Sequence, residues 1–148
     1  DIMPGEWHAV LPAWSRPAPD WNHFARYYPG DEYVDWIGLL AVNQGNDAAR
    51  RTYWVPPRTF FQRVLGLSQR LYPAKPQIVV VTSVEDPTVG RKGGWIETVY
   101  DELTYYRNVR AVAWVSAFDP TWPIESSATS LDAYRRAIAS PYYRSTPP

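Results

Sequence analysis

Four short apolar runs, each accompanied by a stretch of helical periodicity, limit the folds open to this chain more than any other feature. The runs are nearly continuous rather than alternating, and they cover Trp7–Trp14, Tyr33–Val42, Gln77–Val84 and Val109–Phe118. Strands of this kind are typical of parallel sheets in which both faces are covered. The order β-α-β-α-β-α-β-α therefore predicts a parallel α/β architecture with right-handed crossovers.

The helical segments are marked by their apolar spacing and by the residues that stop them. A first short helix is predicted over Asp20–Tyr28 and a third over Gly93–Tyr106. The second is predicted over Arg58–Tyr72, with one apolar face made of Phe60, Phe61, Val64, Leu65 and Leu71. The last is predicted to take Ser130 as its N-cap, to stop at Pro141 and to turn inward Leu131, Tyr134 and Ile138.

Charge and composition exclude several classes of function. Lysine plus arginine equals aspartate plus glutamate, so the formal net charge is zero, and no basic stripe indicates nucleic-acid binding. No apolar stretch is long enough to span a membrane. The chain has no cysteine, and His8 and His23 lack partners at ligand spacing, so no metal is expected. No G-x-G-x-x-G loop follows a strand, and no other cofactor is expected either.

The segment Tyr27–Asn43, which reads YYPGDEYVDWIGLLAVN, resembles the strand-5 to strand-6 region of glycoside hydrolase family 26, the endo-β-mannanases and their relatives. Lys75-Pro76 followed by IVVV is similar to the strand that carries the catalytic nucleophile of that family. AVAW at Ala111–Trp114 and LDAYRRAIASPY at Leu131–Tyr142 are similar to the final strand and the closing helix.

The resemblance implies a (β/α)8 TIM-barrel type of fold, to which this chain contributes about four C-terminal β/α units. Residues 1–148 would then be a single domain, the C-terminal half of a glycoside-hydrolase-like barrel. Four strands cannot close a barrel, and they leave unpaired backbone groups at two sheet edges. We therefore expect a partner that covers these edges: the other barrel half, a second chain or a self-associated copy. The family further implies polysaccharide as a ligand and a secreted or cell-envelope-associated protein.

The catalytic positions depart from the family pattern. Retaining glycosidases use two carboxylates, an acid/base and a nucleophile. The acid/base strand would lie upstream of Asp1, and the nucleophile position, counted from Lys75-Pro76, holds Val81. In the preceding strand, the family's aspartate and tyrosine positions hold Leu40 and Val42. The resemblance therefore implies a catalytic barrel with degenerate catalytic positions.

Among the remaining candidates, Glu85 is a weak candidate for a displaced nucleophile, since it follows the third apolar run. Asp86-Pro87 indicates a solvated turn, and the Arg91-Lys92 pair beside a helix start indicates solvated charges. The family position matched by Trp114 lies under a sugar, and Trp122 follows it in a loop, so both are candidate substrate-binding residues. The other six tryptophans are expected to be packing residues: Trp7, Trp14, Trp21, Trp36, Trp54 and Trp95.

Three functions remain open at this point. The first is a catalytically inactive domain with a structural, interaction or glycan-binding role. The second is an active glycosidase of the β-mannanase type, acting together with a missing N-terminal half. The third is an accessory subunit of a larger assembly. The replaced carboxylate positions favour the first.

Overall fold

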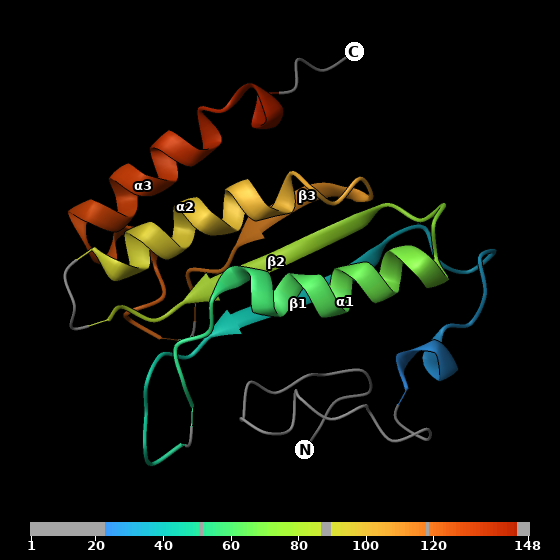
Figure 1. The fold of residues 1–148 in the computed structure, drawn as a ribbon, viewed down its shortest axis with the longest axis horizontal. Helices are drawn as coiled ribbons and strands as arrows, with labels where there is room; N and C mark the ends of the chain where they lie inside the picture. Colours follow the sequence, from blue (N-terminus) through green and yellow to red (C-terminus); the bar gives the residue numbers. More distant parts are fainter. Residues whose placement is uncertain (1–22, 51, 87–89, 118, 145–148) are drawn as a thin grey trace.

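A three-stranded parallel sheet forms the centre of the molecule (Figure 1). The computed structural model describes residues 23–50, 52–86, 90–117 and 119–144. The elements, in chain order, are η3 (Phe24–Tyr27), β1 (Ile37–Asn43), α1 (Pro57–Leu71), β2 (Gln77–Ser83), α2 (Arg91–Leu103), β3 (Val109–Trp114), η4 (Ile124–Ser126), α3 (Ala128–Ile138) and η5 (Pro141–Tyr143).

The strand order is β1-β2-β3, so β2 is the central strand and both of its pairings are parallel. Leu40 of β1 is opposite Val80 of β2, which is in turn opposite Ala113 of β3. Parallel neighbours need a crossover connection, and α1 and α2 supply the two crossovers. The predicted parallel α/β architecture is therefore confirmed.

The core lies between one face of the sheet and the helices α1 and α2. Side chains alternate across a strand, so every second residue of β1 and β2 points to this face. The buried cluster on it joins strand residues with helix residues, namely Ala41, Val79, Val81, Phe61, Leu65, Trp95, Ile96 and Val99. Each fully buried aliphatic side chain contributes about 1.5–3 kcal/mol relative to an exposed one. The third helix, α3, packs on α2 (Figure 1).

The opposite face of the sheet is apolar but is not part of this core. Leu40, Val80 and Ala113 lie side by side on it, and none of the three is fully buried. Leu40 has 63% of its surface exposed. The expectation that the apolar runs are covered on both faces is therefore wrong for β1.

The predicted half barrel of four β/α units is also wrong. Within the residues that the structure describes, the sheet has three strands and is accompanied by three α-helices, and this small α/β domain does not resemble a half TIM barrel. The prediction counted strands from apolar content alone. Apolar content cannot separate a barrel strand from a strand of a small open sheet, because it does not specify what covers each face of the strand. Trp7–Trp14, the first run in that count, lies outside the described residues.

All four predicted helices differ from the observed ones at their bounds. α1 begins and ends one residue earlier than predicted, and α2 begins two residues and ends three residues earlier. The helix predicted over Asp20–Tyr28 is only a four-residue 3₁₀ turn in its described part, η3. In α3 the N-cap is Ser127 and not Ser130 as predicted, because the Ser127 hydroxyl accepts a hydrogen bond from the Ser130 amide. Ser130 lies inside the helix and is fully buried. Ile138, predicted to face inward, is exposed. In the described ranges, no helix is long and apolar enough to cross a membrane.

Candidate functional site

The strands β1, β2 and β3 present their carboxyl ends at one edge of the sheet, and ligands of open α/β sheets bind outside such an edge. We call this edge the carboxyl edge. Glu85 comes two residues after the end of β2, and Trp114 is the last residue of β3. Trp122 lies in the loop that connects β3 to α3. The structure brings these three predicted site residues together around Lys92, from the first turn of α2.

The Lys92 ammonium is held in a cradle of oxygen atoms. Its Nζ donates to three consecutive backbone carbonyls, those of Thr121 at 2.6 Å, Trp122 at 3.3 Å and Pro123 at 2.8 Å. It also donates to the Ser126 hydroxyl at 2.8 Å. The Lys92 side chain is fully buried. Lys92 therefore holds the part of the β3–α3 loop from Thr121 to Ser126.

Burial in this cradle lowers the pKa of Lys92 to about 8, because a buried environment disfavours the charged ammonium. The Glu85 carboxylate, with its Oε2 4.0 Å from Nζ, opposes this effect. Asp119 and Glu125 add smaller contributions of the same sign. At neutral pH, Lys92 is therefore a buried cation whose charge is partly compensated by the nearby carboxylates, rather than a solvated cation.

Glu85 is occupied by structural hydrogen bonds. Its Oε2 accepts from the Ser126 hydroxyl at 2.5 Å and more weakly from the Ser130 hydroxyl at 3.4 Å. The same oxygen is the one that faces Lys92. Because one oxygen atom receives all three contacts, Glu85 connects β2 to α2 and α3 as an acceptor. About a quarter of its side chain, 24%, stays exposed at the edge.

Trp114 is fixed on both sides of its indole. The Nε1 donates to the Trp122 carbonyl at 2.9 Å, and the ring lies edge-on to Trp95, with centroids 6.3 Å apart. The Lys92 Nζ lies 5.7 Å from the Trp114 ring centroid, a distance at which a cation is attracted to the π-face. Trp114 is therefore partly buried and preorganised.

The turn that carries Trp122 is stabilised by Asp119. Its Oδ1 accepts from the Thr121 amide at 2.8 Å and from the Thr121 hydroxyl at 2.6 Å, and these bonds lower the pKa of Asp119. This local turn aims the Thr121 carbonyl at Lys92. The loop conformation thus follows from two side chains, Asp119 from within the loop and Lys92 from α2.

A second pair of charges closes the same edge near β2. Arg91 Nη1 lies 3.0 Å from Asp86 Oδ2, and its guanidinium lies over the Trp54 ring, 4.5 Å from the centroid. Asp86 is buried, so the predicted solvated turn is wrong for this residue. Trp54, expected to be a packing residue, also makes this cation–π contact with Arg91.

The positions that the family resemblance marks as catalytic hold apolar side chains. Val81 is fully buried in the core between α1, α2 and the sheet. Leu40 and Val42 lie on β1, where Leu40 points away from this core. Asn43 remains at the end of β1, where its Oδ1 accepts from the Gly45 and Val55 amides. Neither Val81 nor its strand neighbours offer a carboxylate to a ligand.

Sequence reasoning missed Lys92, which it assigned to a solvated charge cluster. A signal for its burial is present, because Lys92 shares helical spacing with Ile96, Val99 and Leu103, all of which are buried. The three residues that were predicted, Glu85, Trp114 and Trp122, do converge, but their hydrogen bonds and ring contacts with one another and with Lys92 are structural. In the described ranges, no three histidine, aspartate or glutamate side chains cluster as metal ligands.

The fold and this edge define a small parallel α/β domain with an aromatic-lined, hydrogen-bonded carboxyl edge. The chain is 31% identical over 116 residues to endoglucanase H of Acetivibrio thermocellus. The match covers 77% of this chain but only 13% of the length of that protein. No family model matches the chain. The similarity supports a relationship to glycoside hydrolases; it does not single out family 26.

Proposed function

We propose that this chain is a glycoside-hydrolase-related domain that has no hydrolytic activity of its own and contacts polysaccharide and a partner polypeptide. One observation carries the non-catalytic part. At the position that resembles the family 26 nucleophile, the side chain is Val81, fully buried on the helix-covered face. A valine can neither attack an anomeric carbon nor stabilise an oxocarbenium ion. Membership in family 26 is part of this proposal and is supported by the motif at Tyr27–Asn43.

Glu85 supports the same conclusion. The carboxylate is engaged within the protein, since its Oε2 accepts from the Ser126 and Ser130 hydroxyls and faces Lys92, and these contacts connect β2 to α2 and α3. Its partial exposure at the carboxyl edge favours the second candidate, an active β-mannanase-type enzyme that uses Glu85. The two candidates predict opposite results in a hydrolysis assay.

The decisive assay measures reducing ends released from β-mannan and from mixed-linkage β-glucan by the wild-type chain and by Glu85→Gln. We expect no release above buffer from either protein. Release by the wild type that disappears in Glu85→Gln would overturn the proposal and establish the enzyme. Gln keeps the size and accepts the Ser126 hydrogen bond, so a loss of fold would not explain such a result.

Polysaccharide contact at the carboxyl edge is assigned to Trp114 and Trp122, because both are aromatic and partly exposed and the Trp114 indole is fixed by its hydrogen bond to the Trp122 carbonyl. Trp114→Phe removes the indole hydrogen bond and narrows the ring while retaining the packing against Trp95. We expect it to weaken retention of the protein in gels that contain mannan or mixed-linkage glucan.

Interaction with a partner polypeptide is supported by the open face of the sheet. Leu40, Val80 and Ala113 form an apolar strip there, and the outer edge of β1 is unpaired among the described strands. Apolar strips of this kind mark interaction surfaces. Sedimentation velocity on the wild type and on Leu40→Glu tests whether the partner is a second copy: a dimer that dissociates in Leu40→Glu is the expected result, and a monomeric wild type contradicts it.

A further inference from the structure

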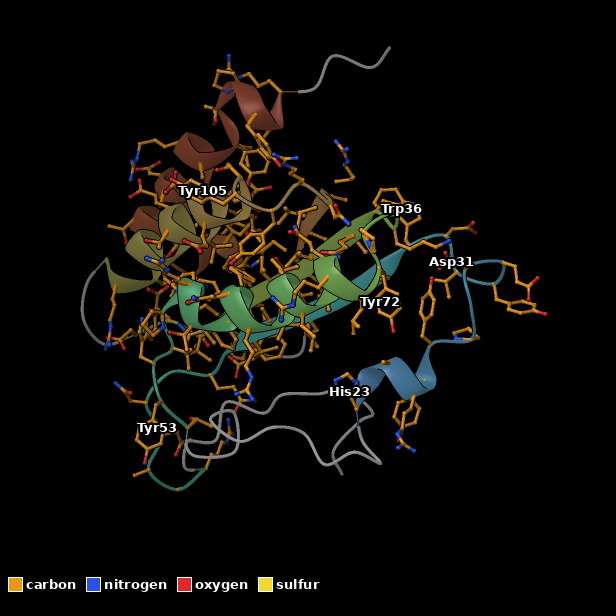
Figure 2. The ribbon with its side chains drawn as sticks, turned by 45° about the vertical axis from the view of Figure 1, so that its right-hand side comes forward. His23, Asp31, Trp36, Tyr53, Tyr72 and Tyr105 are labelled. Atoms are coloured by element: carbon orange, nitrogen blue, oxygen red, sulfur yellow. The ribbon has the colours of Figure 1, made fainter. Side chains whose placement is uncertain are left out.

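A second aromatic surface lies at the opposite end of the strands from Trp114 and Trp122. Trp36 immediately precedes β1, and the amide of the next residue, Ile37, donates to the Pro76 carbonyl at 3.0 Å. Tyr72 closes α1 and stacks on Tyr28, with ring centroids 4.0 Å apart. The segment before β1 is thereby joined to the segment before β2. Figure 2 shows Trp36, Asp31 and Tyr72 together at this end of the molecule.

Polar contacts hold this surface in shape. Lys75 Nζ donates to the Asp31 carbonyl at 2.7 Å and lies 4.0 Å from its Oδ1, while the Tyr28 hydroxyl donates to Oδ1. Tyr33 belongs to the same turn, since its amide donates to the Gly30 carbonyl at 3.2 Å, and Gly30 has a positive φ of 121° that suits glycine. We call the set Tyr28, Asp31, Tyr33, Trp36, Tyr72 and Lys75 the amino-edge surface.

The rings of this surface are unusually exposed for large aromatic side chains. Tyr33 has 71% of its surface exposed and Trp36 has 49%. Tryptophan is highly buried on average, so a half-exposed indole three residues after a more exposed phenol is an informative exception. The backbone that carries both rings is fixed by the contacts of Asp31, Lys75 and Pro76. A ligand that covers the rings therefore meets a preorganised platform.

The chemistry of this platform fits a neutral sugar polymer. Flat rings with polar tips stack on the apolar face of a pyranose, and the largely exposed Asp31 carboxylate can accept hydrogen bonds from sugar hydroxyls. Lys75 lies 4.0 Å from the Asp31 carboxylate, while the exposed Glu32 and Asp35 next to the two rings add negative charge, so the surface does not favour a polyanion. The similarity of the chain to an endoglucanase points to the same class of ligand.

We propose that the amino-edge surface is a second polysaccharide-binding site, in which the exposed rings of Tyr33 and Trp36 stack on sugars of a β-linked glucan or mannan chain. The choice of polymer rests on the proposed function. The site itself is separate from the carboxyl edge, because it lies at the amino ends of the same parallel strands. With contacts at both ends of the strands, one domain could bind two chains or two segments of one chain.

The test is affinity electrophoresis of the wild type, Trp36→Ala, Tyr33→Ala and the double variant in gels that contain β-mannan or mixed-linkage β-glucan. Tyr105→Ala is the matched control, because Tyr105 is exposed to 72% and Figure 2 shows it far from Trp36. We expect the double variant to bind about tenfold more weakly, as the loss of two stacking contacts implies. Unchanged melting temperatures verify that the variants are folded.

The outcomes separate this inference from the proposed function. Retention that weakens in Trp114→Phe but not in the double variant overturns the amino-edge site and leaves the carboxyl-edge assignment intact. If neither polymer retains the wild type, the amino-edge site is overturned as well. A dimer that dissociates in Trp36→Ala without a change in retention overturns it as well, and shows that the surface binds protein. Hydrolysis of either polymer contradicts the proposed function without affecting the amino-edge binding result.

Discussion

Replacing Lys92 by methionine is expected to destabilise the fold by about 3 to 5 kcal/mol at pH 7, the range for removing one member of a buried, hydrogen-bonded charge pair. Methionine fills the space of the lysine stem, but the carbonyls of Thr121 and Pro123 and the Glu85 carboxylate then lose their cationic partner. Each buried acceptor left without a donor costs about 1–3 kcal/mol. Burial of the ammonium itself costs free energy and offsets part of these contacts, so the summed cost is an upper limit for the loss of stability.

The pH dependence of the same variant has a definite sign. The folded-state pKa of Lys92 is about 8, below its ordinary value of 10.5, so unfolding takes up a proton between these two pH values. The stability of the wild type relative to Lys92→Met therefore rises as pH increases from about 8 to 10.5, by up to about 3 kcal/mol. Below pH 8 the difference between the two proteins is constant. Tyrosine ionisation affects both proteins alike and cancels in the difference.

The measurement is urea denaturation of both proteins from pH 7 to 10, together with lysine-selective NMR of the wild type. The chain has two lysines, Lys75 and Lys92, so the titrating signal is assigned by its loss in Lys92→Met. A stability difference that stays flat above pH 8, or a Lys92 signal that titrates in the ordinary lysine range, refutes the buried cradle. A cost below about 1 kcal/mol at pH 7 refutes it independently.

Four further substitutions test the packing and the charges around the cradle. Gly93→Ala places a methyl group 2.9 Å from a backbone oxygen of α3 and should lower the free energy of unfolding by about 1–3 kcal/mol, whereas Gly94→Ala meets nothing within 4 Å and should raise it by about 0.5–1 kcal/mol. Ser127→Ala removes the N-cap of α3 and should lower the free energy of unfolding by about 1 kcal/mol in the same urea assay. The dependence of this free energy on urea concentration should not change. Glu85→Gln removes the nearest anion and should lower the pKa of Lys92 further below 8 in the NMR titration; an unchanged pKa contradicts the assigned contact.

The order of elements after Tyr33 was readable from the sequence because each helix and strand carries its own pattern. The observed α1, Pro57–Leu71, lies within one residue of the predicted Arg58–Tyr72 at each end, and Gln77 begins β2 as predicted. Parallel pairing followed from the alternation of strands and helices. These features depend on local preferences, which a single sequence contains.

The number of β/α units was not readable, because it depends on what covers each strand. An apolar run predicts burial, but Leu40 has 63% of its surface exposed and belongs to a sheet face outside the core. The same limit applies to the site. Trp114 and Glu85 were found from their positions at strand ends, while Lys92 was missed because a charged residue is rarely fully buried unless its charge is compensated. Its three carbonyl partners come from the loop some thirty residues later in the chain.

The central claim is that a glycoside-hydrolase-related domain binds polysaccharide without cleaving it. Mass spectrometry of a β-mannan hexasaccharide and a mixed-linkage β-glucan hexasaccharide, each incubated with an equimolar amount of the chain, tests this most directly, since it detects even a single turnover. A domain that binds without cleaving leaves only intact hexasaccharide, while the protein is retained in polymer-containing gels. Shorter oligosaccharides that appear with the wild type and not with Glu85→Gln would contradict the central claim.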